Sequence, residues 1–95
     1  MNPVVGLLVV DLFISDALTL KDRRRVVKSL LDRLAHRHNV SVADMGPDGR
    51  PHNATLAVSA VANDHVHVER VLHAALRTIE AETRAVCERS ELSVL

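Results

Sequence analysis

The segment from residue 4 to residue 14 constrains the fold of this 95-residue chain most strongly, because it is apolar on both sides of a strand. Its length and its content of valine and leucine favour a β-strand. The even-numbered side chains carry no charge and are Val4, Gly6, Leu8, Val10, Leu12 and Ile14. The odd-numbered side chains are Val5, Leu7, Val9, Asp11 and Phe13. A strand with two apolar faces lies in the middle of a sheet or has a partner on its second face.

A helix is predicted to follow this strand, from Thr19 to about His38. Thr19 and Asp22 have the spacing of a capping box, in which the two side chains bind backbone N–H groups at the start of a helix. Behind them, apolar side chains recur with helical spacing at Leu20, Val27, Leu30, Leu31 and Leu34. This stripe covers one side of the helix, and Asn39 is the residue expected to stop the helix after His38.

The centre of the chain predicts two strands joined by a turn. Residues 40–45 alternate between apolar and polar side chains, which is typical of a short strand. Gly46–Gly49 has the composition of a tight turn, with Pro47 suited to its second position. Residues 54–63 form the next strand, and most of their side chains are apolar on both faces.

The last third of the chain predicts a second helix and an edge strand. Asn63 and Asp64 supply the N-terminal cap of the helix. Its apolar stripe comprises Val68, Val71, Leu72, Ala75, Leu76 and Ile79. Residues 85–95 alternate poorly and carry charges, as an edge strand facing solvent does.

The resulting order is strand, helix, strand, strand, helix, strand. Two βαβ units with right-handed crossovers give a four-stranded antiparallel sheet with both helices on one face. We therefore predict one α+β domain over residues 1–95, a ferredoxin-like β-α-β-β-α-β two-layer sandwich. Its first and third strands, which are the most apolar, lie in the centre of the sheet.

Composition excludes several classes of protein. Phe13 is the single aromatic residue, so no surface can be built on several stacking rings. Cys87 is the single cysteine, which excludes an intramolecular disulfide and fits a reducing compartment. The apolar run at residues 4–10 has no basic flank and is followed by Asp11, so it is neither a signal peptide nor a membrane span. We expect a cytoplasmic protein with no membrane partner.

A net charge of zero hides a basic first helix. Residues 21–37 contain seven basic and two acidic side chains, a net charge of +5. At 100° per residue, four of the bases lie on the side opposite the leucine stripe. They are Lys21, Arg24, Arg25 and Lys28. Such a cluster can contact the phosphates of RNA or of a ribosomal particle in a salt-dependent manner. A helix surface that is only solvated and an acidic protein partner are the alternatives.

Two neighbours modify this cluster. Arg23 projects toward the apolar side of the helix, where we expect it to pair with a carboxylate rather than with a ligand. Lys28 and Asp32 are four residues apart and partly neutralise each other. The remaining bases lie in the first turns, where they oppose the helix dipole. A purely structural helix would place them in its last turns.

Recognition of RNA bases by stacking is excluded by the same composition. The RRM module shares the predicted order of elements, and it stacks bases on aromatic side chains of its central strands. Residues 54–63 contain no aromatic side chain, and residues 4–14 contain only Phe13. Any contact with RNA therefore has to use basic side chains.

Several motifs resemble catalytic or ligand-binding sites but have simpler structural explanations. Gly46 and Gly49 match the glycines of a KH loop, but that loop joins two helices, whereas these lie between predicted strands. His65, Glu69 and His73 drift by about 40° per step around a helix and have no fourth ligand beside them. The single cysteine has no positioned base nearby in the sequence. We predict no catalytic residue, no metal site and no cofactor, and we expect that the protein is not an enzyme.

One face of a two-layer sandwich has no helices over it. The apolar residues predicted on that face are Val5, Leu7, Val9, Ala57 and Val61. A contiguous apolar surface of this kind suggests burial against another molecule, and a twofold homodimer is the simplest arrangement. A monomer with an apolar sheet face is the alternative.

Three segments resemble the YlxP-like family of small bacterial proteins. They are the basic run from Leu18 to Leu30, the Asn39–Ala43 segment and the Ala60–Asp64 segment. The resemblance implies a ferredoxin-like fold and an uncharacterised function. It also implies a link to translation, because genes of this family often lie among genes for translation and ribosome maturation. By position, the basic run of the family corresponds to Lys21, Arg23, Arg24 and Lys28. Thr19 replaces the usual serine, arginine replaces lysine in the basic run, and the central loop is rich in glycine and proline.

Two functions remain at this point. The first is a non-catalytic binding domain that contacts RNA or a ribosomal particle through its basic first helix. The second is a homodimeric structural or protein-interaction module with no nucleic-acid role.

Overall fold

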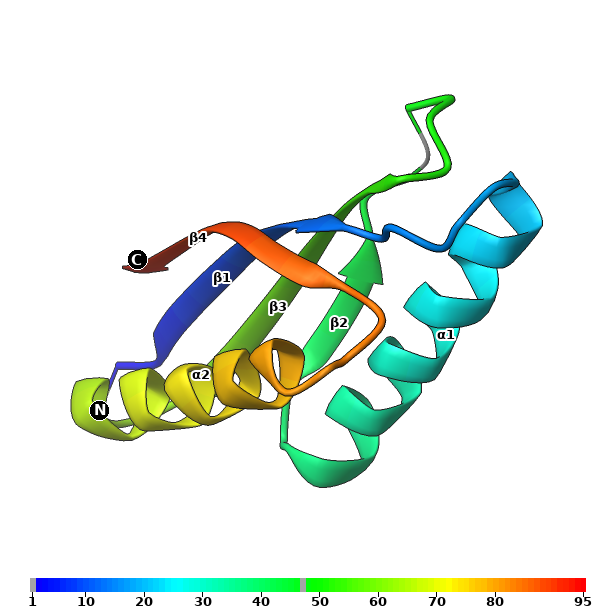
Figure 1. Cartoon of the computed structure of the whole chain (residues 1–95). Coiled ribbons are helices and arrows are strands. Elements are labelled where there is room, and N and C mark those ends of the chain that lie inside the picture. The colour runs from blue at the N-terminus through cyan, green and yellow to red at the C-terminus, as the bar shows by residue number, and fades with distance from the viewer. Residues whose placement is uncertain (1, 47) are drawn as a thin grey trace.

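The computed structural model describes residues 2–46 and 48–95. Its elements are β1 (Val4–Phe13), α1 (Leu20–Arg37), β2 (Ser41–Asp44), β3 (Asn53–Ala62), α2 (His65–Glu80) and β4 (Val86–Val94). The strands form one antiparallel sheet in the order β2-β3-β1-β4. Both helices cover the same side of this sheet (Figure 1). The predicted ferredoxin-like α+β fold, with the first and third strands in the centre, is confirmed.

The core lies between the sheet and the two helices and is built from aliphatic side chains. The sheet contributes Leu8, Val10, Leu12, Leu56 and Val58, each at most 2% exposed. The helices contribute Val27, Leu30, Leu34, Val68, Leu72 and Ile79, each at most 1% exposed. These residues come from the apolar stripes predicted for the helices and from the even-numbered side chains of both central strands, so the predicted periodicity is correct.

The opposite face of the sheet has no helix over it. Buried and half-buried side chains alternate along most of β1 and β3. The register pairs Val5 with Val61 and Val9 with Ala57, so these side chains lie on one face. Leu7 lies between Val5 and Val9 on the same face, so all five residues predicted for the open face occupy it.

Both ends of α1 agree with the prediction. Thr19 is the N-cap, and its side chain and that of Asp22 form the complete capping box. The C-cap is His38, with φ −129° and ψ 150°, so the helix ends where it was predicted to end, and Asn39 is the first residue beyond the cap. The His38 ring also joins the two helices, because its Nε2 lies 2.8 Å from Thr78 Oγ1 on α2.

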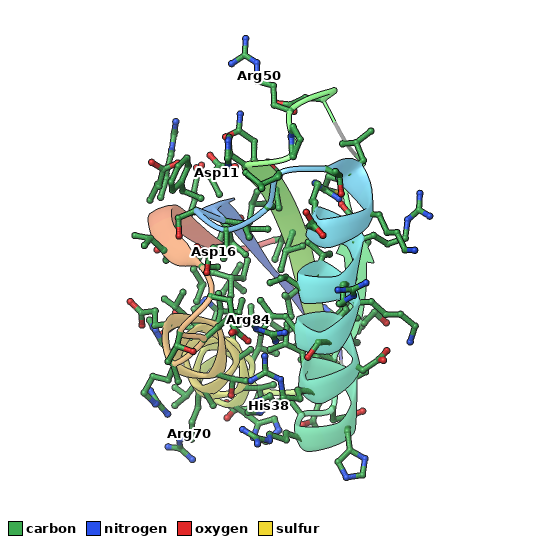
Figure 2. The ribbon with its side chains drawn as sticks, turned by 45° about the vertical axis from the view of Figure 1, so that its right-hand side comes forward. Asp11, Asp16, His38, Arg50, Arg70 and Arg84 are labelled. Carbon is green, nitrogen blue, oxygen red and sulfur yellow. The ribbon has the colours of Figure 1, made fainter. Side chains whose placement is uncertain are left out.

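The connection between β2 and β3 projects beyond the sheet (Figure 1). Gly46 and Gly49 have φ values of +93° and +87°, in the region that favours glycine. Pro47, predicted at the second position of the turn, lies outside the described residues. Arg50 lies in the projecting part of this loop and points away from the sheet (Figure 2).

Gly6 allows α2 to approach β1 closely. A Cβ atom at this position would lie 2.4 Å from Val68 Cγ1 and 2.7 Å from Leu72 Cδ1. Both of those side chains are fully buried. The absence of a side chain at Gly6 therefore decides how closely the helix packs on the central strand.

The last strand forms one edge of the sheet, as predicted. It pairs with β1 from Val86 to Val94, and the register shifts between Asp11 and Leu12. Arg89 and Glu91 are both highly exposed on this edge, and their charged groups lie 4.0 Å apart. Charges of this kind discourage pairing with further strands.

Candidate nucleic-acid interface

An acidic side chain in the first turn of α1 binds the backbone amides that precede the helix. The carboxylate of Asp22 accepts hydrogen bonds from the backbone N–H groups of Leu18 at 3.1 Å and Thr19 at 3.2 Å. The Leu18 amide, followed by the Thr19 side chain, lowers the pKa of the Asp22 carboxyl. Asp22 is therefore ionised at neutral pH and committed to the cap, and the bases that follow it start a well-defined helix.

All four bases predicted for the interface are exposed on α1. They are Lys21, Arg24, Arg25 and Lys28. At 100° per residue they lie within about 100° of one another on the helix surface, on the side away from the buried stripe. The structure therefore brings the predicted residues together on one surface.

The four bases differ in how far their charge is neutralised. Lys28 Nζ lies 2.7 Å from Asp32 Oδ2, so the predicted pair forms, although both side chains remain more than 60% exposed. Arg25 is close enough to Asp22 to stabilise its charged form. Among the described residues, the side chains of Lys21 and Arg24 make neither a hydrogen bond nor an ion pair. The start of α1 therefore presents at least two unpaired positive charges to solvent.

Arg23, the remaining member of the basic run, is buried at 3% exposure. Its Nη1 and Nη2 atoms each lie 2.9 Å from a carboxylate oxygen of Asp44, which confirms the predicted carboxylate partner. Its Nε also donates to the carbonyl of Asn53 at 2.7 Å. Arg23 is therefore a structural residue, although it corresponds by position to the basic run of the YlxP-like family.

Sequence reasoning missed a second charged cluster, centred on Glu82 between α2 and β4. The Glu82 side chain is 4% exposed and accepts hydrogen bonds from Arg33 on α1 and from Arg84. The Arg84 Nη2 atom also donates to Ser29 Oγ at 3.1 Å. Because the hydrogen bonds from Arg84 and Arg33 outweigh burial, the pKa of Glu82 falls to about 2. The cluster ties α1 to the α2–β4 connection.

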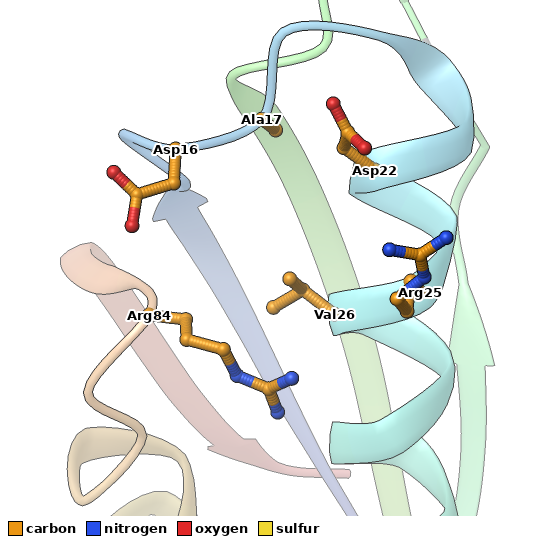
Figure 3. A pocket seen from close by; sticks show the side chains of 6 residues that line it. All are labelled: Asp16, Ala17, Asp22, Arg25, Val26 and Arg84. Atoms are coloured by element: carbon orange, nitrogen blue, oxygen red, sulfur yellow. The ribbon is translucent and has the colours of Figure 1, made fainter.

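A hollow of about 210 Å³ opens beside this cluster, next to the first turns of α1. Figure 3 shows its lining residues, Asp16, Ala17, Asp22, Arg25, Val26 and Arg84. Two carboxylates and two guanidinium groups give this hollow no net charge. It therefore adds nothing to the positive surface of the helix.

The helix-free face carries the residues predicted for a dimer contact. Val5, Leu7, Val9 and Ala57 are partly exposed, and Val61 is 61% exposed. At one end of the face the Phe13 ring stacks on His52, with centroids 5.4 Å apart. The same end holds Asp11, whose carboxylate accepts a hydrogen bond from Thr55 Oγ1 at 2.8 Å.

The histidine and cysteine motifs of the sequence form no larger site within the described residues. His65 and Glu69 lie 3.3 Å apart on α2. No group of three histidine, cysteine or acidic side chains in residues 2–46 and 48–95 is placed to hold a metal ion. Burial raises the pKa of the Cys87 thiol, which lowers its reactivity. Over the same residues, neither helix is both long and apolar enough to span a membrane.

Comparison with solved structures supports the fold. The de novo designed protein Foldit4 matches with a TM-score of 0.58 and 18% identity, over 99% of this chain and 97% of the designed chain. SnoaB, a cofactor-independent oxygenase from Streptomyces nogalater, matches with a TM-score of 0.49 and 12% identity, over 100% and 92% of the two chains. The first match shows a shared fold, and the second is too distant to support an argument about function.

Comparison of sequences gives the family. The uncharacterized protein YlxP of Bacillus subtilis (strain 168) is 28% identical over 78 residues, which are 82% of this chain and 85% of that relative. The expected resemblance to YlxP-like proteins is therefore confirmed. Residues 5–91 match the family described as protein of unknown function DUF503. Because this match covers nearly the whole chain, the protein belongs to the DUF503 family.

Proposed function

We propose that this protein is a non-catalytic domain that binds RNA, free or within a ribosomal particle, through the exposed bases of α1. The observation that carries the proposal is the exposed cluster of Lys21, Arg24 and Arg25 at the start of the helix. Lys21 and Arg24 have no partner among the described residues, and Lys28 extends the cluster by one turn although it pairs with Asp32.

The position of these bases in the helix supports a role outside folding. Positive side chains near a helix N-terminus oppose the macrodipole, at a cost of about 0.3–1 kcal/mol each when exposed. The chain nevertheless places Lys21 in the first turn of α1, where this effect acts, and Arg24 and Arg25 in the turn that follows. A phosphate ligand would offset this cost, whereas solvation alone would not.

The rest of the surface favours phosphate contacts over base recognition. The helix-free face of the sheet carries one aromatic side chain, Phe13, and its ring already stacks on His52. Binding should therefore depend on charge, with little preference for sequence and a clear dependence on salt.

Binding of a labelled single-stranded RNA at several salt concentrations tests the proposal. Three phosphate contacts predict a slope of about 2 in a plot of log Kd against log salt concentration, because each contact on a single strand contributes about 0.7. The triple variant Lys21→Ala/Arg24→Ala/Arg25→Ala should bind more weakly, with a slope near zero.

A second triple variant provides a control of equal charge. Arg37, Arg70 and Arg77 are exposed outside the first turns of α1, and replacing all three with alanine removes the same charge from other surfaces. This variant should keep the wild-type slope. Equal loss of binding in both triple variants would show a general effect of net charge and contradict the proposed site. Co-sedimentation with ribosomes, tested with the same variants, extends the measurement to RNA in a particle.

A further inference from the structure

The helix-free sheet face has a regular arrangement of large and small side chains. Val5, Leu7 and Val9 form a row on β1, and their register partners on β3 are Val61, Ser59 and Ala57. Leu7 and Val9 therefore stand beside a serine and an alanine. The face consists of a ridge on β1 beside a row on β3 that is low at Ser59 and Ala57 and higher at Val61.

A ridge beside a shallow row is complementary to itself. Consider a twofold axis that runs parallel to the strands, midway between β1 and β3. It places β1 of each copy over β3 of the other copy. Leu7 would then meet the partner's Ser59, Val9 would meet the partner's Ala57, and Val5 would meet the partner's Val61 as an apolar pair at the end of the contact. Large side chains facing small ones interdigitate as the inner faces of a β-sandwich do.

The charges on the face are compatible with the same arrangement. Asp11, at one end of the face on β1, would lie over the partner's Thr55. Arg89 and Glu91 lie on β4, which is one edge of the sheet. The axis would place β4 over the partner's β2, whose residues on this face are Ser41 and Ala43. Like charges are therefore not opposed, and the charged side chains lie at the edge and at one end of the apolar area, as polar residues do in protein interfaces.

We propose that two copies of this chain pack through their helix-free sheet faces about that axis. The four strands comprise 33 residues. At about 3.3 Å per residue and about 4.8 Å between strands they cover roughly 500 Å². Because β4 would lie over the shorter β2, the pair would bury somewhat less than twice this area, about 900 Å². This is below the usual size of a stable interface, so we expect a weak dimer with a dissociation constant in the micromolar range. This inference does not rest on the proposed RNA binding.

Sedimentation equilibrium from about 1 μM to about 1 mM measures the mass directly, over the range in which a dimer of micromolar affinity assembles. The wild type should pass from one chain to two. Val61→Glu places a carboxylate on the apolar face and should raise the dissociation constant about tenfold or more. Val66 on α2 is 57% exposed, compared with 61% for Val61, so Val66→Glu is a matched control and should leave the dimer unchanged.

A third variant tests the axis itself. Ala57→Leu enlarges the apolar surface but fills the row that receives the partner's Val9, so it should weaken the dimer. Stronger association of this variant would overturn the proposed arrangement. A mass of one chain at 1 mM, or equal effects of Val61→Glu and Val66→Glu, would overturn the dimer.

Since α1 lies on the other side of the sheet, Val61→Glu should keep the salt dependence of RNA binding, which separates the two proposals.

Discussion

Arg23 and Asp44 form a two-point ion pair between the first turn of α1 and the end of β2, in which the Arg23 side chain is buried and that of Asp44 is 28% exposed. The Arg23 side chain also donates to the carbonyls of Asn53 at 2.7 Å and Gly46 at 3.2 Å, which flank the projecting loop. The hydrogen bond from Arg23 lowers the pKa of Asp44. One guanidinium group therefore joins the helix, the end of β2 and both ends of the loop.

Replacing Arg23 should destabilise the fold. Arg23→Ala leaves Asp44 and two carbonyls without their donor, and we expect a loss of about 2–4 kcal/mol in the free energy of unfolding. Urea denaturation followed by circular dichroism measures this change. The neighbouring exposed variant Arg24→Ala should change stability by no more than about 0.5 kcal/mol. Equal effects of the two substitutions would contradict the structural role of Arg23.

Acid should weaken the Glu82 cluster. The carboxyl has a pKa of about 2 in the folded protein, compared with an ordinary value of 4.5. A lowered pKa contributes stability that is fully present above pH 4.5 and is lost as the pH falls toward 2, on the order of 3 kcal/mol. The difference in unfolding free energy between wild type and Glu82→Gln should therefore shrink between pH 5 and pH 2. The exposed variant Glu80→Gln serves as the control, and a constant difference for Glu82→Gln would refute the assignment.

A methyl group at Gly6 should disturb the packing of α2 on β1. Gly6→Ala brings a Cβ atom to 2.4 Å from Val68 Cγ1, and we expect a destabilisation of about 1–3 kcal/mol. The double variant Gly6→Ala/Val68→Ala removes the nearer of the two clashing atoms and leaves Leu72 Cδ1 at 2.7 Å, so its stability loss should be smaller than the sum of the two single losses. Thermal denaturation of the four proteins completes the cycle. Strict additivity would show that the clash is relieved elsewhere.

The capping box should contribute measurably to α1. Thr19 Oγ1 accepts a hydrogen bond from the Asp22 amide at 3.1 Å, and Thr19→Ala should cost about 1 kcal/mol of stability. Thr19→Ser keeps the acceptor and should restore most of the loss. Chemical denaturation of both variants distinguishes a lost cap from a lost methyl group, because only the alanine variant lacks the oxygen.

Features that depend on periodicity within one element could be predicted from the sequence. The alternation in residues 4–14 identified the central strand and both of its faces. The helical angle of Arg23 separated it from its exposed neighbours, and its carboxylate partner followed from the direction in which it projects. These inferences succeeded because helix and strand geometry fix where a side chain points once the element is known.

Features that depend on contacts between distant segments could not be predicted. Arg33 and Glu82 are 49 residues apart, and Glu82 follows α2 in a connection without periodicity. The contact of His38 with Thr78 likewise joins the C-cap of α1 to α2. Helical periodicity identified the bases of α1 as a cluster. It did not show that the side chains of Lys21 and Arg24 stay unpaired, because that depends on where the fold places the carboxylates of distant segments.

The pairing of β1 with β4 joins residues near the two ends of the sequence, since Gly6 lies opposite Val94. During synthesis, the most apolar strand therefore has no second neighbour until residues 86–94 have left the ribosome. Long-range pairing of this kind is slow to form and leaves a strand edge exposed in the meantime. A nascent chain that stalls before residue 86 would hold β1 with a bare edge, and such fragments should aggregate or be degraded rather than accumulate as a smaller folded form.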